Sequence, residues 1–234
     1  HGAGPQINDA LAEAGLETNK IDGLRVTDAA TLDVARKVFQ RENLRLVDAL
    51  EELGTRARPV PTGVFRARFL DRDRYGFVGE VEGVDLDPLR NAVHAGHLPI
   101  LTSLGETASG QIVNINADVA ARELALAIKP FKIVFLTDTG GLLDAKGQPI
   151  SSVNLTEDFE RLMAEDWVHS GMRLKLREVK QLLDDLPLSS SVSITSAANL
   201  PRELFTHRGA GTLIQRGEQV YEFGSWEGVD RSRM

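Results

Sequence analysis

The chain has 234 residues, of which 42% are hydrophobic and 26% are charged, and its formal net charge is −7. This composition is typical of a globular protein with room for one sizeable domain or two small ones. No run of eighteen apolar residues occurs, which excludes a membrane-spanning helix, and the negative charge argues against a general nucleic-acid binder. The absence of cysteine excludes disulfides and thiolate metal sites and fits a cytoplasmic protein.

The first five residues, 1–5, contain two glycines and a proline and predict a tight loop. A helix is expected next, because Ile7, Leu11 and Ala14 share one helical face and Gly15 can end it. A glycine loop at the start of a helix suits a phosphate or carboxylate, although an ordinary turn is the more frequent case. Such a loop normally follows a strand, so we expect a first strand before His1.

Residues 21–28 predict a short extended piece that leads into a helix capped by Thr27 or Asp28. A second helix is expected after the first, with Gly54 as its end. Arg25 lies in the loop before the cap, where a solvated side chain is the default and a clamp on a substrate carboxylate is the alternative. The expected apolar faces are Leu32, Ala35, Val38 and Phe39 in the first helix, and Leu46, Ala49, Leu50 and Leu53 in the second.

Residues 65–81 alternate between apolar and charged side chains, which is the period of a β-strand. The cluster Asp71–Arg74 interrupts the alternation and predicts the turn of a β-hairpin. The region 56–74 contains six arginines, which could form a basic patch. Because acidic residues are interleaved with them, a solvated face is the preferred interpretation.

Residues 98–104 predict a buried strand, 120–128 a helix and 133–138 a second apolar strand, which together suggest a parallel βαβ unit. Ligands bind beyond the carboxyl ends of parallel strands, so the loops 114–118 and 137–141 are expected to converge there. The first loop ends in Asp118, whose carboxylate could cap the helix. A polar loop that holds an anion or a metal is the alternative.

A further helix is expected from Ser170, with Lys175 in its first two turns, where the helix dipole disfavours a cation. Strands are expected at 192–196 and after a glycine turn at 209–211. The polar tail 217–234, which includes Trp226, predicts a linker. The expected buried face of the helix is Val179, Leu182, Leu183 and Leu186, while His94 and His97 lack the spacing of metal ligands.

Five spaced strings resemble the amino acid kinase family, most of all its members that phosphorylate N-acetyl-L-glutamate. They occur in the family's order at residues 1–6, 23–27, 114–118, 136–141 and 171–175. The resemblance implies an α/β fold, a three-layer αβα sandwich with a mainly parallel central sheet and a substrate-side β-hairpin. It also implies a kinase domain over 1–216, with a substrate lobe at about 1–130 and a nucleotide lobe at about 131–216, and a first strand with a lysine before His1.

The activity implied is transfer of the γ-phosphoryl group of ATP to the side-chain carboxylate of N-acetyl-L-glutamate, with Mg²⁺ held mainly by ATP. In this resemblance Lys175 stabilises the transferring group and Asp118 organises the catalytic lysines. No residue is expected to bind a metal directly. The substrate-binding residues implied are Gly2, Ala3, Gly4, Arg25 and Asn114, and those that border the nucleotide are Thr137, Asp138, Gly140 and Gly141. Ala3 departs from the family, where glycine is commoner.

The segment 203–212 resembles the arginine-sensitive members, which implies a regulatory site for L-arginine at Glu203, Gly209 and Gly211. Homo-oligomers and a C-terminal acetyltransferase domain are further partners that the resemblance implies. The compartment would be the cytoplasm, or the mitochondrion if the source is fungal. The alternative function is an arginine-binding scaffold that supports an acetyltransferase domain without kinase turnover.

Overall fold

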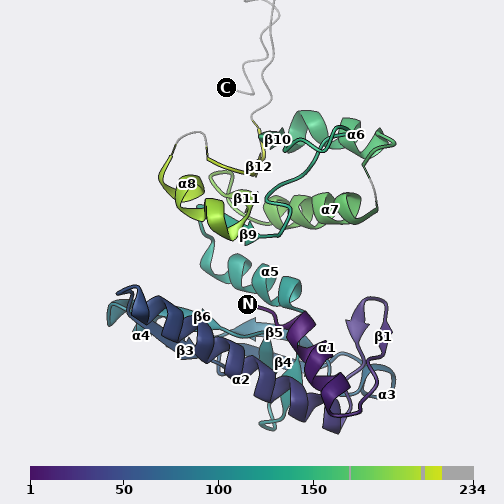
Figure 1. The fold of residues 1–234 in the computed structure, drawn as a ribbon, viewed down its shortest axis with the longest axis vertical. Coiled ribbons are helices and arrows are strands. Elements are labelled where there is room, and N and C mark those ends of the chain that lie inside the picture. Colours follow the sequence, from purple (N-terminus) through teal and green to yellow (C-terminus); the bar gives the residue numbers. More distant parts are fainter. Residues whose placement is uncertain (169, 207–208, 218–234) are drawn as a thin grey trace, which may run out of the picture. The chain divides into compact units, whose positions relative to one another are not determined.

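A computed structural model describes residues 1–168, 170–206 and 209–217, with only the backbone of Ser170, Gly171 and Leu174. The chain divides into two compact units, His1–Ile128 and a second from Lys129 onward, and each is described by itself. In Figure 1 the first unit runs from purple to teal and the second from teal to yellow. In the part of the chain that the structure describes, no helix is long and apolar enough to cross a membrane. The predicted linker lies outside the described residues, apart from Gly217.

Helix α1 is present as predicted, although it begins at Gly4, two residues inside the predicted loop. It packs along α2, which Figure 1 shows beside it. Pro5 lies in its first turn, and Gly15 follows with a φ of 68°. Ile7 and Leu11 are buried and form one hydrophobic cluster with Phe39 of α2. The helices of this unit are α1 (Gly4–Glu13), α2 (Ala29–Glu52), α3 (Arg72–Tyr75), α4 (Asp87–His94) and α5 (Ala117–Ile128).

The expectation of two helices between residues 29 and 53 is wrong, because α2 is one continuous helix of 24 residues. No glycine or proline interrupts it, and its buried side continues through Asn43 and Val47. The expected second apolar face is therefore also wrong: Leu46 is 43% exposed and Leu53 is 83% exposed. Of the two predicted capping residues, Thr27 and Asp28, it is Asp28 that caps α2: its carboxylate accepts a hydrogen bond from the Thr31 amide at 2.7 Å.

Three sheets belong to the first unit. The predicted hairpin is confirmed, since β4 and β5 pair antiparallel and α3 connects them. These strands continue into a four-stranded sheet of order β5-β4-β7-β8, while β3 pairs with β6 and β1 with β2. The strands are β1 (Lys20–Ile21), β2 (Leu24–Arg25), β3 (Ala57–Val60), β4 (Phe65–Phe69), β5 (Gly79–Val84), β6 (Leu98–Leu101), β7 (Leu104–Glu106) and β8 (Ile112–Asn114).

The expected parallel βαβ unit around α5 is wrong. Strand β8 pairs antiparallel with β7, whereas β9 pairs with β11 in the sheet of the second unit. The chain reverses between β7 and β8 in a turn in which Gly110 has a φ of 80° and the Thr107 amide donates to the Gln111 carbonyl. Strand and helix patterns in the sequence do not reveal such a reversal. The loops 114–118 and 137–141 lie in different units, and their convergence stays a prediction.

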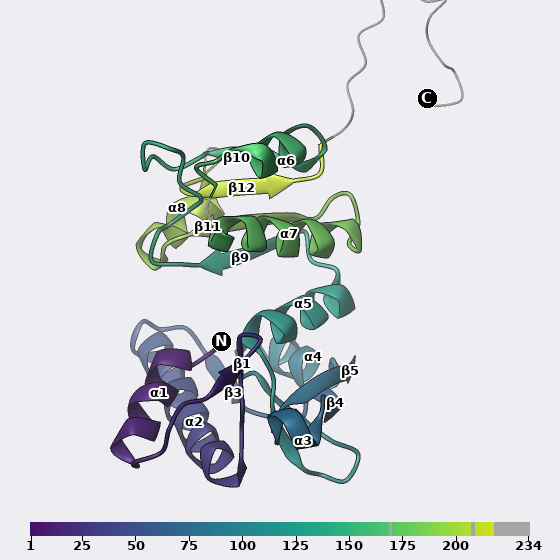
Figure 2. The same cartoon turned by 90° about the vertical axis from the view of Figure 1, so that its right-hand side faces the viewer.

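The second unit contains a four-stranded sheet of order β10-β12-β11-β9, with both parallel and antiparallel pairs. Figure 2 shows α7 lying along this sheet. The predicted buried face of α7 is confirmed. The predicted α/β class is also confirmed, because both units contain helices and sheets. The elements are β9 (Lys132–Leu136), β10 (Ser152–Asn154), α6 (Leu155–Ala164), α7 (Ser170–Asp184), β11 (Ser191–Thr195), the 3₁₀ turn η1 (Ala197–Asn199), α8 (Leu200–Phe205) and β12 (Thr212–Gln215).

Candidate active site

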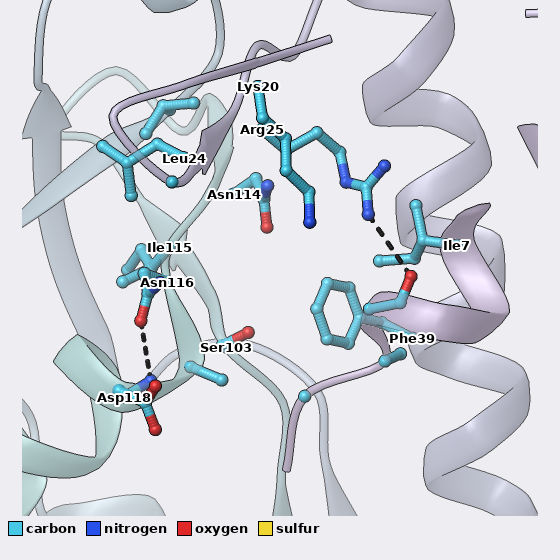
Figure 3. A pocket seen from close by; sticks show the side chains of 16 residues that line it. Ile7, Lys20, Leu24, Arg25, Phe39, Ser103, Asn114, Ile115, Asn116 and Asp118 are labelled. Carbon is cyan, nitrogen blue, oxygen red and sulfur yellow. Dashed lines mark hydrogen bonds between the residues drawn. The ribbon is translucent and has the colours of Figure 1, made fainter. Parts of the chain in front are cut away.

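A pocket of about 200 Å³ lies in the first unit, between the N-terminal loop, the β1–β2 hairpin and the start of α5. Figure 3 shows its lining side chains. The structure brings together here all of the predicted site residues that precede residue 120. These are Gly2, Ala3, Gly4, Arg25, Asn114 and Asp118.

The N-terminus of α5 is capped by Asn116. Its side-chain oxygen accepts hydrogen bonds from the Asp118 amide at 2.8 Å and the Val119 amide at 3.2 Å. The interpretation of Asp118 as the capping residue is therefore replaced, because the cap does not depend on its carboxylate. Asp118 lies in the first turn and lines the pocket, where the helix dipole favours a negative charge.

The N-terminal loop approaches α5 closely at Gly2. A Cβ atom at this position would lie 3.1 Å from the Cβ atom of Ala117, so a side chain here would press on the start of α5. The methyl group of Ala3 is buried in the same hydrophobic cluster as Ile7 and Phe39. The departure from glycine at Ala3 thus adds to the core of the unit, and the loop keeps its glycines at the two flanking positions.

Arg25 is 9% exposed and holds the hairpin against α1. Its guanidinium donates to the Asn8 side-chain oxygen at 2.7 Å and to the Gly4 carbonyl at 3.3 Å, as Figure 3 shows for the latter. Burial lowers the pKa of the Arg25 guanidinium, yet an arginine remains charged at neutral pH. A third hydrogen bond goes to the Thr18 hydroxyl at 3.4 Å, and because all three partners are neutral, the positive charge is available to an anion in the pocket.

Lys20 is a pocket residue that the sequence reasoning missed. It lies directly opposite Arg25 in the two-residue pairing of β1 with β2, and both residues line the pocket. Like charges directly opposite each other destabilise a strand pair. Among the described residues, no ion pair joins either side chain to a carboxylate. The signal in the sequence was the five-residue spacing of two cations around the Asp22-Gly23 turn.

The second unit carries the loop that was predicted to border a nucleotide. The Thr137 amide donates to the Thr195 carbonyl at 2.8 Å, which ties the loop to the end of β11. Gly140 has a φ of 69°, a conformation that favours glycine. A Cβ atom at Gly141 would lie 2.9 Å from the Thr212 hydroxyl, so this position has no room for a side chain without a shift. Asp138 is exposed.

Lys175 lies in the second turn of α7, as predicted. Its ammonium group is 4.9 Å from the ring centroid of Phe135 in β9 and 3.6 Å from a carboxylate oxygen of Glu178. Both contacts have a structural explanation, since a cation over an aromatic face and an i, i+3 pair each stabilise a helix modestly. Lys175 belongs to the second unit and the pocket residues belong to the first.

Of the three residues predicted for arginine regulation, Glu203 carries a buried carboxylate and Gly209 lies against it, whereas Gly211 lies against the end of β11. Glu203 is 4% exposed and pairs with the Lys132 ammonium at 2.6 Å, and it accepts from the Ala210 amide at 2.8 Å. Burial alone would raise the pKa of the Glu203 carboxyl, but these hydrogen bonds together lower it. Gly209 lies so close that a Cβ atom would be 2.4 Å from the carboxylate, and one at Gly211 would be 2.2 Å from the Ile194 carbonyl oxygen.

We expect Glu203→Gln to lower the free energy of unfolding by about 1–3 kcal/mol at pH 7, because the buried side chain at position 203 loses its charged hydrogen bond to the Lys132 ammonium. The folded-state pKa of Glu203 is lowered, so its stabilisation is present above the unfolded pKa and is lost as the pH falls through the folded value. Urea unfolding at neutral and acidic pH should therefore show the two proteins converging in acid.

The control is Glu80→Gln, because Glu80 forms an ion pair of the same length with Arg68 on an exposed face. Exposed pairs contribute about 0–1 kcal/mol. Equal losses in the two variants would contradict a structural role for the buried carboxylate.

Comparison with known proteins places these features in a family. Residues 1–189 match the model described as the amino acid kinase family, and the chain belongs to that family. It is 53% identical over its whole length to an acetylglutamate kinase of Xanthomonas campestris pv. campestris, of which it covers 55%. It is 54% identical over 220 residues, 94% of the chain, to the Neurospora crassa protein "arg-6, mitochondrial", of which it covers 25%.

The fold is shared with a solved N-acetylglutamate synthase from Neisseria gonorrhoeae, complexed with coenzyme A and N-acetyl-glutamate. The TM-score is 0.78 at 24% identity, over 94% of this chain and 51% of that one. At this identity the likeness concerns the fold alone. The chain spans about half the length of the bacterial kinase it matches, so the activity of the whole protein is a matter for proposal.

Proposed function

We propose that the protein transfers the γ-phosphoryl group of ATP to the side-chain carboxylate of N-acetyl-L-glutamate. The observation that carries the proposal is the pair of cations, Lys20 and Arg25, that face each other across a hairpin at a pocket. Their mutual repulsion is relieved by an anionic ligand, which a dicarboxylate derivative supplies. Similarity to kinases that carry this activity in their names supports the same substrate.

The main obstacle to the reaction is charge repulsion. The acceptor carboxylate is already ionised, so no general base is needed. An anionic acceptor about 4 Å from a phosphoryl charge costs about 4 kcal/mol per charge pair at an effective dielectric constant near 20. Positioning and cations must offset this cost. We assign Lys175 to the transferring phosphoryl group, Asp118 to the orientation of the catalytic lysines, and Arg25 with Asn114 to the non-reacting part of the amino acid.

The nucleotide is assigned to the loop of the second unit. The residues that would border ATP are Thr137, Asp138, Gly140 and Gly141. At Gly141 the loop backbone lies so close to Thr212 that a side chain has no room. Mg²⁺ would accompany ATP and bind mainly to its phosphates and to water, which is the usual coordination of this ion at nucleotide sites. When bound, it neutralises charge on the phosphates.

Trapping of the product with hydroxylamine tests the proposal. An acyl phosphate reacts with hydroxylamine to form a hydroxamate, so the intact protein with ATP, Mg²⁺ and N-acetyl-L-glutamate should produce one. Controls without ATP and with L-glutamate in place of the acetylated substrate should produce none or much less. Failure to detect an ATP-dependent hydroxamate would favour the alternative, an arginine-binding scaffold without turnover.

We expect Arg25→Ala to raise KM for N-acetyl-L-glutamate about ten- to a hundredfold while KM for ATP changes little. A charged hydrogen bond contributes about 1.5–3 kcal/mol, and Arg25 is assigned to a carboxylate that does not react. Steady-state kinetics with each substrate varied in turn measures both constants. Arg90→Ala, which removes an exposed arginine paired with Asp87 on α4, is the control. A selective rise in KM for ATP would overturn the assignment.

Further partners remain predictions. L-Arginine is proposed as an inhibitor on the resemblance of segment 203–212 alone, and the Glu203 carboxylate would have to exchange contacts to receive it. Calorimetry of the intact protein with L-arginine tests this point, and the absence of binding would end it. Homo-oligomerisation and an acetyltransferase domain rest on the same resemblance. The compartment is proposed as cytoplasmic, or mitochondrial as the name of the Neurospora crassa relative states for that protein.

A further inference from the structure

One buried hydroxyl group joins the two residues that are assigned to the non-reacting end of the substrate. Thr27 is completely buried and does not line the pocket. Its hydroxyl donates to the carbonyl of Arg25 at 2.8 Å, and it accepts a hydrogen bond of 3.4 Å from the side-chain amide of Asn114. The contact to Asn114 spans 87 residues and connects the hairpin β1–β2 to strand β8.

The backbone completes a ring of hydrogen bonds around Thr27. The Phe77 amide donates to the Thr27 carbonyl at 2.6 Å, and the Asn114 amide donates to the Phe77 carbonyl at 2.9 Å. On its other side, the Thr27 amide donates to the Tyr75 carbonyl at 2.9 Å. Gly76 closes the turn, since a Cβ atom there would lie 2.2 Å from the Thr27 carbonyl oxygen. Thr27 is therefore fixed on both sides, and its hydroxyl has a defined position.

Proton counting then determines how the Asn114 amide is turned. A threonine hydroxyl has one proton and two acceptor lone pairs, and the proton of Thr27 is used by the Arg25 carbonyl. Toward Asn114 the hydroxyl can therefore only accept, which requires the nitrogen of the amide to face it. The opposite orientation would place two acceptors against each other. The oxygen of Asn114 and its second N–H are left for the pocket, into which Figure 3 shows this side chain pointing.

We propose that Thr27 is a positioning residue for the amino-acid substrate. It sets the orientation of the Asn114 amide and the place of Arg25 without touching the substrate itself. The inference rests on the proposed function of the pocket. Loss of the Thr27 hydroxyl should weaken binding of the acceptor and leave binding of the nucleotide unchanged, because both hydrogen bonds of this hydroxyl lie within the first unit.

The test uses Thr27→Val, which keeps the shape of the side chain and removes the hydroxyl, and Thr27→Ser, which keeps the hydroxyl. In the intact protein, Thr27→Val should raise KM for N-acetyl-L-glutamate about three- to tenfold, the effect of one lost hydrogen bond. KM for ATP should be unchanged, and Thr27→Ser should restore most of the affinity. A role in folding alone would lower thermal stability without separating the two KM values.

Thr102→Val is the matched control. Thr102 is buried in the same unit, and its hydroxyl donates to the Pro61 carbonyl at 2.6 Å and accepts from the Leu104 amide at 3.3 Å. The Thr102→Val variant should lose about as much stability as Thr27→Val and leave KM for N-acetyl-L-glutamate unchanged. A double-mutant cycle of Thr27→Val with Asn114→Ala should be non-additive, because the two side chains act through one contact.

The outcomes separate the two proposals. If the parent protein forms no hydroxamate, the proposed function fails before any variant is compared. If it is active and Thr27→Val leaves KM for N-acetyl-L-glutamate unchanged, or if both KM values rise together, the positioning role is overturned. If Thr27→Val does not fold, Thr27→Ala, which also removes the hydroxyl, takes its place beside Thr27→Ser and in the cycle with Asn114→Ala. An unchanged KM for N-acetyl-L-glutamate, or additive effects in that cycle, would then overturn the positioning role.

Discussion

Asp118→Asn should reduce kcat by about 10²-fold while leaving the fold intact. The substitution is nearly isosteric and removes one negative charge from the first turn of α5. Loss of one charge contact that is needed in the transition state costs about 10²–10³ in rate, whereas loss of a charge at a helix N-terminus costs about 0.3–1 kcal/mol of stability. The cap of the helix survives, because Asn116 provides it. Hydroxamate formation and thermal unfolding, measured on the same preparation, give both quantities.

The matched control is Glu123→Gln, the same carboxylate-to-amide change in the same helix. Glu123 pairs with Arg122 at 2.6 Å and does not line the pocket. It should lose a comparable small stability and keep its turnover. A decrease of kcat below fivefold in Asp118→Asn, or an equal decrease in Glu123→Gln, would return Asp118 to a structural role.

Periodicity predicted the helices well where burial and sequence pattern coincide. The face of α7 follows from apolar residues at helical spacing and is buried as expected. In α1 the predicted Ile7 and Leu11 are buried, whereas the predicted Ala14 is exposed just beyond the end of the helix. The pattern failed in α2, where the continuation of the buried side passes through Asn43, a polar residue that donates to the Ile100 carbonyl at 2.9 Å. A buried amide whose nitrogen donates to a distant carbonyl is a tertiary effect, and a hydrophobic pattern does not contain it.

The candidate site likewise contains residues that could be predicted from the sequence and residues whose role depends on tertiary contacts. The grouping of the N-terminal glycines with Arg25, Asn114 and Asp118 followed from the family resemblance, and the pocket brings them together. Lys20 and Thr27 were missed because their importance depends on pairing. Lys20 matters through its place opposite Arg25, and Thr27 through a contact with a residue 87 positions away. Neither relation is visible until the hairpin and β8 are placed in space.

The distribution of charge in the pocket connects these residues to the chemistry. Two cations lie on the hairpin and one carboxylate lies at the start of α5, so the pocket presents opposite charges from different elements. A substrate with two carboxylates needs one end held and the other left to react. The hairpin cations suit the end that is held, which is why substitutions there should alter KM, and substitutions of the groups assigned to the phosphoryl transfer should alter kcat.

Lys175→Ala should lower kcat by about 10²–10³, the size expected for one cation that stabilises charge on the transferring phosphoryl group. KM for both substrates should change far less, since the contact is strongest in the transition state. The alternative is that Lys175 only supports α7 through Phe135 and Glu178, in which case the variant would lose some stability and almost no turnover. Steady-state kinetics at saturating ATP and N-acetyl-L-glutamate, together with thermal unfolding, distinguishes the two.

Lys180→Ala is a close structural match for the control. Lys180 lies in the same helix, pairs with Asp184 at 2.6 Å, and has its ammonium 5.6 Å from the ring centroid of Phe159. Each lysine therefore combines an intrahelical ion pair with an aromatic contact. If both variants lose similar stability and only Lys175→Ala loses turnover, the difference belongs to the chemistry and not to the helix. A loss below fivefold in Lys175→Ala, with Lys180→Ala unchanged or not, would remove Lys175 from the catalytic role.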